Sequence, residues 1–323
     1  SSLWLDEFGT LWTVEDTLFD TWRRAASFQG QTPFYYTFAW ISVNLFGESE
    51  IALRLPSLLF GLAAWLVFGF GSLKLFGPRA GLCAYLLAAV DPTLIHASAD
   101  ARPYALAFLM LALAILGFLV SCSKASRGAR ALWVFCGAAT IWAHYVFYPF
   151  VLGIVAAYLL VPDLRARYRP SQFGLDSLIH LLLVALAVPQ FTQLFARRSV
   201  LDWVSTGHTG GGLLTATLPY WPLLALGVLA VWKRNDPEKN LFRALWISLL
   251  IGALGFLLLK MLGANVIHWR YTQGGLVIII LLSAASFAVV NRYAAAVAIV
   301  VGALFLVTAL ERAKAAYGTH TLK

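Results

Sequence analysis

The sequence predicts an all-α, polytopic membrane protein with about ten transmembrane helices, judged from the length of its apolar runs. Three observations support this fold class. Of 323 residues, 60% are hydrophobic and only 12% are charged, and the mean hydropathy is +0.77. Soluble domains contain roughly 45–50% apolar residues. Several apolar stretches are long enough to cross a hydrocarbon core of about 30 Å as helices, which satisfy their own backbone hydrogen bonds in lipid.

The predicted spans follow one another from residue 55 almost to the end of the chain. They cover residues 55–74, 78–97, 104–121, 131–146, 148–162, 174–194, 213–232, 243–262, 274–290 and 293–310. Residues 55–323 are therefore expected to form one transmembrane helical domain. Residues 1–54 are expected to form a loop with interfacial helices that carries an Asp-Glu motif.

The segment TPFYYTFAWISVNL, residues 33–46, is apolar and aromatic. As a helix it would be about 21 Å long, too short to span. We expect it to lie in the membrane interface, which keeps Asp6 on the same side as Glu48, Glu50 and Arg54. Ser1 is followed at once by WLDE without a basic region or signal peptide. A first transmembrane helix is expected to precede this chain.

The net charge of +9 follows membrane topology and gives no indication of nucleic-acid binding. Lys and Arg gather at every second connection: Lys74 with Arg79, then Lys124, Arg127 and Arg130, then Arg165, Arg167 and Arg169, then Lys233, Arg234 and Lys239, and finally Arg292. Under the positive-inside rule these connections face the cytoplasm. The alternate connections then face outwards, and they carry the unusual polar residues.

Two of these outer segments contain acidic residues at an apolar boundary, where charges are costly. Asp6 and Glu7 follow Trp4 and Leu5; they either cap an interfacial helix or supply a carboxylate that orients and deprotonates an acceptor hydroxyl. In SADARPY, residues 98–104, Asp100 and Arg102 either form a structural salt bridge or leave Arg102 to bind a lipid phosphate. In the second case Asp100 positions Arg102 or helps to hold a metal.

The remaining outer connections combine aromatic rings with His and Arg. His144 and Tyr145 lie in WAHYVFYPF, and His268, Arg270 and Tyr271 lie in HWRY, residues 268–271. Both segments are typical of interfacial aromatic belts, and both are candidate substrate contacts. The second also suits a phosphosugar, with Arg on the phosphate and aromatic rings on the sugar. A further loop, 195–212, contains Arg197, Arg198, Asp202 and His208 and is either a plain connector or a substrate lid.

A series of motifs, in the same order, resembles those of the integral-membrane C-type glycosyltransferases, in the branch of lipid A aminoarabinose transferases and relatives of protein O-mannosyltransferases. SLWLDEFGTLW resembles that branch's first outer loop, and QTPFYY, which includes Tyr35, resembles its HPPLYY. LFGESEIALRLPSLLFGL resembles the stretch that follows, SADARPYAL with Tyr104 resembles SxEARPYAL, and HWRY resembles a late outer-loop Arg-Tyr. Gln31, Thr32 and Asp100 depart from the family's His, Pro and Glu.

The resemblance implies an inverting transfer from a polyprenyl-phosphate sugar to a lipid, glycan or protein acceptor, with Asp6 as principal catalytic residue and Glu7 supporting it. It places the protein in a bacterial inner membrane with the site facing the periplasm or exterior. Some relatives use a divalent cation, for which Asp6 and Asp100 are the candidate ligands here. Other interpretations are a lipid-linked sugar flippase or transporter and an inactive membrane receptor of the same fold.

Overall fold

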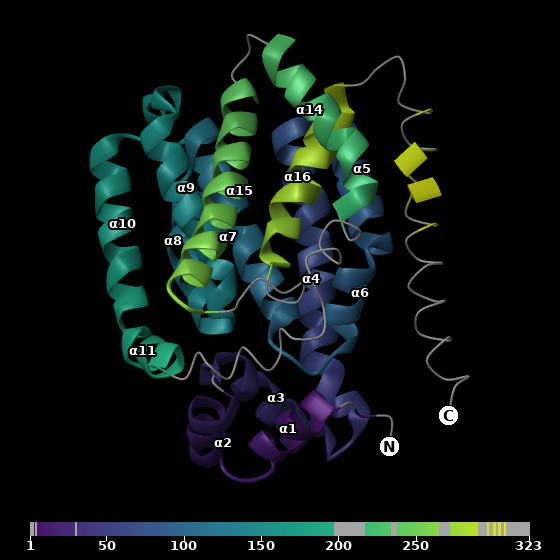
Figure 1. Cartoon of the computed structure of the whole chain (residues 1–323), viewed down its shortest axis with the longest axis vertical. Coiled ribbons are helices and arrows are strands. Elements are labelled where there is room, and N and C mark those ends of the chain that lie inside the picture. The colour runs from purple at the N-terminus through teal and green to yellow at the C-terminus, as the bar shows by residue number, and fades with distance from the viewer. Residues whose placement is uncertain are drawn as a thin grey trace.

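The computed structural model describes residues 3, 5–29, 31–196, 217–233, 238–264 and 272–289, with isolated positions between 296 and 307. Within these ranges every regular element is a helix, so the predicted all-α fold class is confirmed. The long helices run side by side in one bundle, and the N-terminal helices lie together at one end of it (Figure 1). Of the predicted spans, 293–310 falls almost entirely outside the described residues.

Three short helices and one turn of π-helix form the N-terminal cluster. They are α1 (Leu5–Val14), α2 (Leu18–Arg24), η1 (Ala25–Gln29) and α3 (Pro33–Phe46). The Thr17 side chain caps α2 by accepting a hydrogen bond from the Asp20 N–H, and Pro33 occupies the first turn of α3. The predicted helix at residues 33–46 is confirmed. In Figure 1 this cluster, in purple, closes the lower end of the bundle.

The first long helix, α4 (Glu50–Phe76), begins at the N-cap Ser49, whose side chain accepts from the Ala52 N–H. It ends at Gly77, where a φ of 89° favours glycine. The chain then returns through α5 (Pro78–Val90) and α6 (Pro92–Ala99). Gly61 lets α6 approach α4 closely, because a Cβ there would lie 2.0 Å from the Ser98 Oγ.

The span predicted for residues 78–97 is not one straight helix, because α5 and α6 meet at an angle of 61°. Pro92 has no N–H to donate to the α5 ladder. Asp91 stabilises the new helix start by accepting from the N–H groups of Thr93 and Leu94 at 2.8 and 3.0 Å. The Tyr220 hydroxyl, from η4 (Leu218–Tyr220), donates to the other Asp91 oxygen at 2.7 Å.

The central helix is α7 (Tyr104–Lys124), and 83% of its most apolar window is buried. It packs against α8 (Arg127–Ala143), which ends at His144. After η2 (Tyr145–Phe147), α9 (Tyr148–Leu160) runs back along the bundle to η3 (Pro162–Ala166). Figure 1 shows α7, α8 and α9 as neighbours in the teal part of the bundle.

The predicted span 174–194 is also broken, into α10 (Pro170–Ala185) and α11 (Val188–Ala196). Pro189 lies in the first turn of α11, where it cannot continue the hydrogen bonding of α10. The described part of the chain is completed by α14 (Trp221–Lys233), α15 (Glu238–Met261) and α16 (Gly274–Val289).

Membrane character is visible in both helix length and surface. Three helices, α4, α7 and residues 239–261 of α15, are long and apolar enough to cross a bilayer, and α5 with α6 would make a fourth as one bent span. Large apolar side chains are exposed along the bundle; examples are Leu58, Leu62, Leu86, Phe135, Leu182 and Leu254. A soluble protein would not expose so many, so lipid is their natural solvent. The total of about ten spans stays a prediction.

The bundle has two chemically different ends. The helix ends that contain Lys74, Arg79 and Lys124 lie away from the N-terminal cluster, since α4 and α7 run between the two ends of the bundle. Arg167 joins them by donating to the Ser123 carbonyl. We call this the basic end. We call the other end, which contains α1 to α3, the site end.

Candidate active site

Glu7 is the buried anchor of the site end. Its side chain has 0% exposure, and Arg54 on α4 binds both carboxylate oxygens, through Nε at 2.8 Å and through NH2 at 2.6 Å. The Ala101 N–H donates to Glu7 Oε1 at 3.1 Å. The bidentate pair and the further N–H donor satisfy the carboxylate in its buried position. Glu7 therefore fixes α1 to both α4 and the segment before α7.

The segment 100–103 connects α6 to α7 and is held from α1. The Thr10 hydroxyl donates to the Ala101 carbonyl at 2.9 Å, so Thr10 and Glu7 bind both polar groups of one residue. The Arg102 N–H donates to the Asp100 carbonyl at 2.7 Å, which tightens the turn before Pro103. This turn determines where the side chains of Asp100 and Arg102 can lie.

Arg102 makes few hydrogen bonds for a half-buried guanidinium. Its NH1 donates to Gln29 Oε1 at 3.1 Å, and its Nε is buried without an acceptor in the described residues. No carboxylate oxygen of those residues lies within 4.0 Å of it, so the structural salt bridge with Asp100 is not formed there. Unused N–H donors beside an apolar bundle suit an anion.

Asp6 points to a different environment from Glu7 although the two are adjacent. It lies in the first turn of α1 and is exposed, whereas Glu7 is buried. Its charge and that of Asp100 both act on Arg102, and both also act on Tyr36. The structure thus brings Asp6, Asp100 and Arg102 within electrostatic range of one another at the site end.

Asp100 is half-buried, and this burial raises the pKa of its carboxyl above the usual value. Arg102 and then His96 oppose the rise, whereas the charges of Glu7 and Asp6 add to it. The net effect favours the protonated acid.

Tyr35 and Tyr36 are buried residues of α3 that lie within electrostatic range of Arg102. Both rings have 0% exposure. The Tyr35 hydroxyl lies 2.8 Å from Ser57 Oγ, and Ser57 donates to the Arg102 carbonyl at 3.2 Å, so α3, α4 and the 100–103 turn are joined. Burial raises the pKa of both phenols, which keeps them neutral.

His144 and Tyr104 form a buried aromatic pair beside Arg102. Their rings stack with centroids 4.9 Å apart, and Tyr145 lies next to His144 at 5.3 Å. Burial, and then the charge of Arg102, lower the pKa of His144 to about 3. His144 is therefore neutral near pH 7, and its imidazole acts as a polar aromatic ring rather than as a cation.

This pKa predicts a pH-dependent stability. Between pH 6.5 and about 3 the unfolded chain protonates His144 and the folded chain does not. Stability should therefore fall on acidification through this window, by at most about 1.4 kcal/mol per pH unit for this group. We expect the apparent Tm of the wild type to drop more between pH 7 and pH 5 than that of His144→Phe. Equal drops in the two proteins would contradict the assignment.

An apolar groove opens beside the Asp100–Arg102 turn, between α4, α5, α6 and α7. Its volume is about 360 Å³, and it is lined by Leu58, Gly61, Leu62, Ala64, Trp65, Ala88, Ala89, Leu94, Ile95, Ser98, Ala99, Ala105 and Phe108. Leu58, Leu62 and Ile95 are 55%, 51% and 53% exposed, so the groove opens through the side of the bundle. Ser98, Ala99 and Ala105 place its end next to Asp100 and Arg102. A lipid chain could lie there with its head group at Arg102.

Several predicted site residues lie outside the described ranges. They are His268, Arg270 and Tyr271, and the same holds for Trp269, Arg197, Arg198, Asp202 and His208. In the described part of the chain, Asp6 and Asp100 belong to no group of three or more His, Cys, Asp or Glu side chains that could hold a metal ion. Two carboxylates alone are a poor fit for a resident divalent cation, so no step below depends on one.

Sequence reasoning missed the partners that hold the site together. The sequence could have predicted that Arg54 pairs with an acidic residue, because a cation at the start of an apolar span needs a counter-ion. Ser57 and Thr10 act through backbone carbonyls, and Gln29 acts through one amide oxygen on Arg102. Neutral polar residues carry no comparable signal, so only the fold reveals these contacts.

One family profile matches the chain. The profile of the dolichyl-phosphate-mannose-protein mannosyltransferase family matches residues 30–192, which is half of the chain and includes Asp100, Arg102, Tyr104 and His144. No curated protein matches the chain. The match covers α3 to α11 and thus most of the described bundle. The chain belongs to the dolichyl-phosphate-mannose-protein mannosyltransferase family and is a membrane glycosyltransferase of the C type.

Proposed function

We propose that this protein transfers a sugar from a polyprenyl-phosphate donor to a lipid, glycan or protein acceptor, with inversion at the anomeric carbon. The family implies a lipid-linked sugar donor and an acceptor. The observation that carries the proposal is the position of Arg102 in the turn between Ala99 and Ala105, which both line an apolar groove of about 360 Å³. A donor with a phosphate between a lipid chain and a sugar matches this combination of a cation and an apolar channel.

The donor enters sideways from the bilayer. Its polyprenyl chain lies in the groove between α4 and α7, where Leu58 and Leu62 face the lipid, and its phosphate binds the unused N–H groups of Arg102. Gln29 fixes one side of the guanidinium, and the stacked rings of Tyr104 and His144 limit its movement on another. Arg102 then stabilises the negative charge that develops on the departing phosphate.

Asp6 acts on the acceptor. Its exposed carboxylate orients an acceptor hydroxyl or amine on the side of the sugar opposite the phosphate and takes the proton. The new bond forms between the acceptor atom and the anomeric carbon, the bond from that carbon to the phosphate oxygen breaks, and polyprenyl phosphate leaves with the electron pair. Attack opposite the leaving group inverts the configuration. Glu7 supports this step by docking α1, through Arg54 and Ala101.

The aromatic residues complete the sugar site. In this proposal Tyr145 and the edge of Tyr104 pack on the sugar, whereas the buried Tyr35 acts on the site through Ser57. His268, Arg270 and Tyr271 are proposed from the sequence as a second phosphate and sugar contact. Asp100, whose pKa is raised by burial, positions Arg102 without neutralising it.

We place this site on the outer face of a bacterial inner membrane. The basic end contains Lys74, Arg79 and Lys124, and positive loops stay in the cytoplasm. The site end then faces the periplasm or exterior, with residues 1–54 as its cap and residues 55–323 as the membrane domain.

Replacement of Arg102 tests the donor site. Arg102→Ala is expected to raise the KM for a polyprenyl-phosphate sugar by about 10- to 100-fold, the range for a lost charge-assisted hydrogen bond of about 1.5–3 kcal/mol. Arg102→Lys should recover part of the loss, since Lys keeps the positive charge but cannot form bidentate hydrogen bonds to the phosphate. The measurement is donor binding and steady-state transfer with purified protein.

The matched control is Arg23→Ala. Arg23 is an exposed arginine at the same end, and it pairs with Asp20 on its own helix. Its loss should leave the donor KM within about twofold, because exposed ion pairs contribute little. Wild-type donor affinity in Arg102→Ala would overturn the phosphate assignment, and so would equal losses in both variants.

A further inference from the structure

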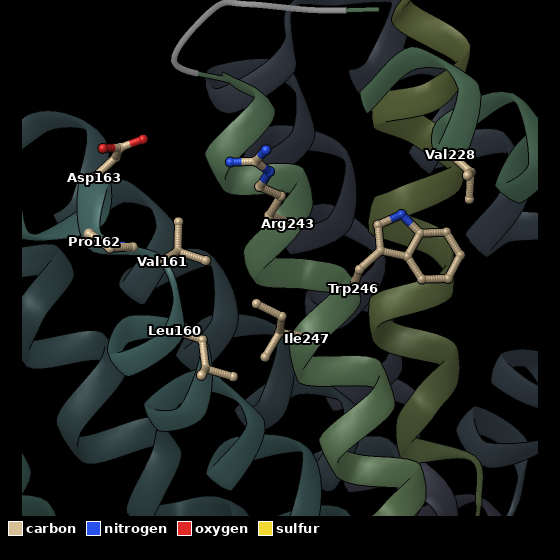
Figure 2. A pocket seen from close by; sticks show the side chains of 8 residues that line it. All are labelled: Leu160, Val161, Pro162, Asp163, Val228, Arg243, Trp246 and Ile247. Carbon is tan, nitrogen blue, oxygen red and sulfur yellow. The ribbon is translucent and has the colours of Figure 1, made fainter. Parts of the chain in front are cut away.

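A second cavity lies at the basic end, away from the residues assigned to sugar transfer. It has a volume of about 420 Å³ and is lined by Leu160, Val161, Pro162, Asp163, Val228, Arg243, Trp246 and Ile247. These residues come from the end of α9, from η3, from α14 and from α15. Figure 2 shows the η3 side and the α15 side facing each other across an opening.

The mouth of this cavity carries one negative and one positive side chain. In Figure 2, Asp163 on η3 and Arg243 on α15 lie on opposite sides of its upper edge. The Asn240 amide lies between them: it donates to Asp163 Oδ2 at 3.0 Å, and Arg243 donates to Asn240 Oδ1 at 3.4 Å. Asp163 and Arg243 do not form one of the ion pairs within 4.0 Å in the described residues. The two charges are thus held apart.

Below the charges the cavity wall is apolar and opens outwards. Figure 2 shows Leu160 and Ile247 beneath Asp163 and Arg243. Leu160 and Val228 are 63% and 51% exposed, so acyl chains in the bilayer can reach the wall. The indole Nε1 of Trp246 is buried without an acceptor in the described residues, which adds an unused donor to the lining. Tryptophan at this position is typical of the level of lipid head groups.

We propose that this cavity binds the head group of an aminophospholipid of the phosphatidylethanolamine type. The lipid phosphate binds Arg243, and the primary ammonium binds Asp163, so the lipid replaces the weak bridge through Asn240. The acyl chains then run along Leu160 and Val228. The bound lipid holds η3 against α14 and α15 at the basic end.

The charge pattern selects among the common lipid classes. A primary ammonium has three N–H donors for a carboxylate, whereas the quaternary ammonium of phosphatidylcholine has none. Phosphatidylglycerol would satisfy Arg243 but would place an anion beside Asp163 with no cation between them. The adjacent Arg165, Arg167 and Arg169 attract anionic lipids in general, so preference for a lipid with a primary ammonium is the distinguishing property of this site.

The test uses the full chain, purified in detergent, delipidated and titrated with phosphatidylethanolamine, phosphatidylglycerol and phosphatidylcholine of identical acyl chains. Binding is measured by native mass spectrometry, and the apparent Tm is recorded with each lipid. We expect phosphatidylethanolamine to bind about tenfold more tightly than the other two, as one charge-assisted hydrogen bond would produce. Equal binding of all three lipids, or preference for phosphatidylglycerol, would overturn the proposal.

Two variants assign the lipid to this cavity. Arg243→Gln should weaken phosphatidylethanolamine and phosphatidylglycerol about tenfold each. Asp163→Asn should remove the preference for phosphatidylethanolamine over both phosphatidylglycerol and phosphatidylcholine. Both side chains are exposed, so the fold should persist, and the Tm without added lipid checks this. Arg169→Gln removes an equal charge outside the cavity and should change nothing. Unaltered lipid preference in Asp163→Asn, or unaltered lipid affinity in Arg243→Gln, would also overturn the proposal.

Discussion

Asp6→Asn should lower the rate of sugar transfer by about 10²- to 10⁴-fold, the usual contribution of a general base. Asparagine keeps the size of the side chain and removes its ability to take a proton. Because Asp6 is exposed in the first turn of α1 and the buried contacts there are made by Glu7, the variant should fold normally. The measurement is the turnover number with saturating donor and acceptor, with the Tm recorded in parallel.

Glu15→Gln is the matched control for Asp6→Asn. Glu15 is an exposed acid just beyond the end of the same helix, so its replacement removes an equal charge from the same end of the bundle. A purely electrostatic role for Asp6 would make the two variants resemble each other. Normal turnover in Asp6→Asn would exclude Asp6 as the base, whatever the control does.

Glu7→Gln should lower the free energy of unfolding by about 3 kcal/mol, near the lower end of the range for breaking a buried ion pair. The replacement leaves Arg54 without its bidentate partner, and Arg54 is 27% exposed, which moderates the cost. The glutamine oxygen can still accept from Ala101, so the effect reports mainly the lost charge. The measurement is the denaturant or thermal midpoint in detergent, together with transfer activity at low temperature.

Glu50→Gln separates this effect from a general loss of charge near Arg54. Glu50 also lies close to Arg54, at 3.8 Å and one helical turn away, but its side chain is 35% exposed. Its replacement should cost less than about 1 kcal/mol. Adding Arg54→Met to Glu7→Gln should recover part of the lost stability, since it removes the uncompensated cation. A loss as large in Glu50→Gln as in Glu7→Gln would contradict the anchoring role of Glu7.

Helices could be predicted from the sequence because the apolar runs are long and lipid leaves the backbone few other structures. The breaks at Asp91 and at residues 186–187 were missed although Pro92 and Pro189 are visible in the sequence. Proline is tolerated in membrane helices when other groups satisfy the freed backbone, so its presence alone does not predict a break. At Asp91 the cap and the bond from Tyr220 decide the outcome, and both require the fold.

The site was predictable in part because charge is costly at a membrane boundary. That cost singled out Asp6, Glu7, Asp100 and Arg102 from the sequence, and the fold brings all four to one end of the bundle. The interfacial placement of residues 33–46 also predicted that Asp6 and Arg54 share a side, and the contact from Arg54 to the adjacent Glu7 confirms it.

The division of labour between the two acids could not be predicted. Adjacent residues on a helix differ in direction by about 100°. One of them therefore faces α4 and the other faces solvent, but the sequence does not reveal the direction in which α1 docks. The choice depends on Arg54 and Ala101, which contact the helix from elements far apart in the chain. Likewise, the sequence left open whether Arg102 pairs with Asp100, and only the fold shows that the two form no ion pair within 4.0 Å in the described residues.

The most direct test of the proposed function is the fate of a donor labelled in its sugar. Purified protein is incubated with a radiolabelled polyprenyl-phosphate sugar and candidate acceptors in sealed vesicles, and the product's anomeric configuration is determined by NMR. We predict sugar transfer with inverted configuration and release of polyprenyl phosphate, lost in Asp6→Asn. Donor binding without cleavage, or movement of the intact donor between leaflets, would contradict the proposed function and indicate a receptor or a flippase.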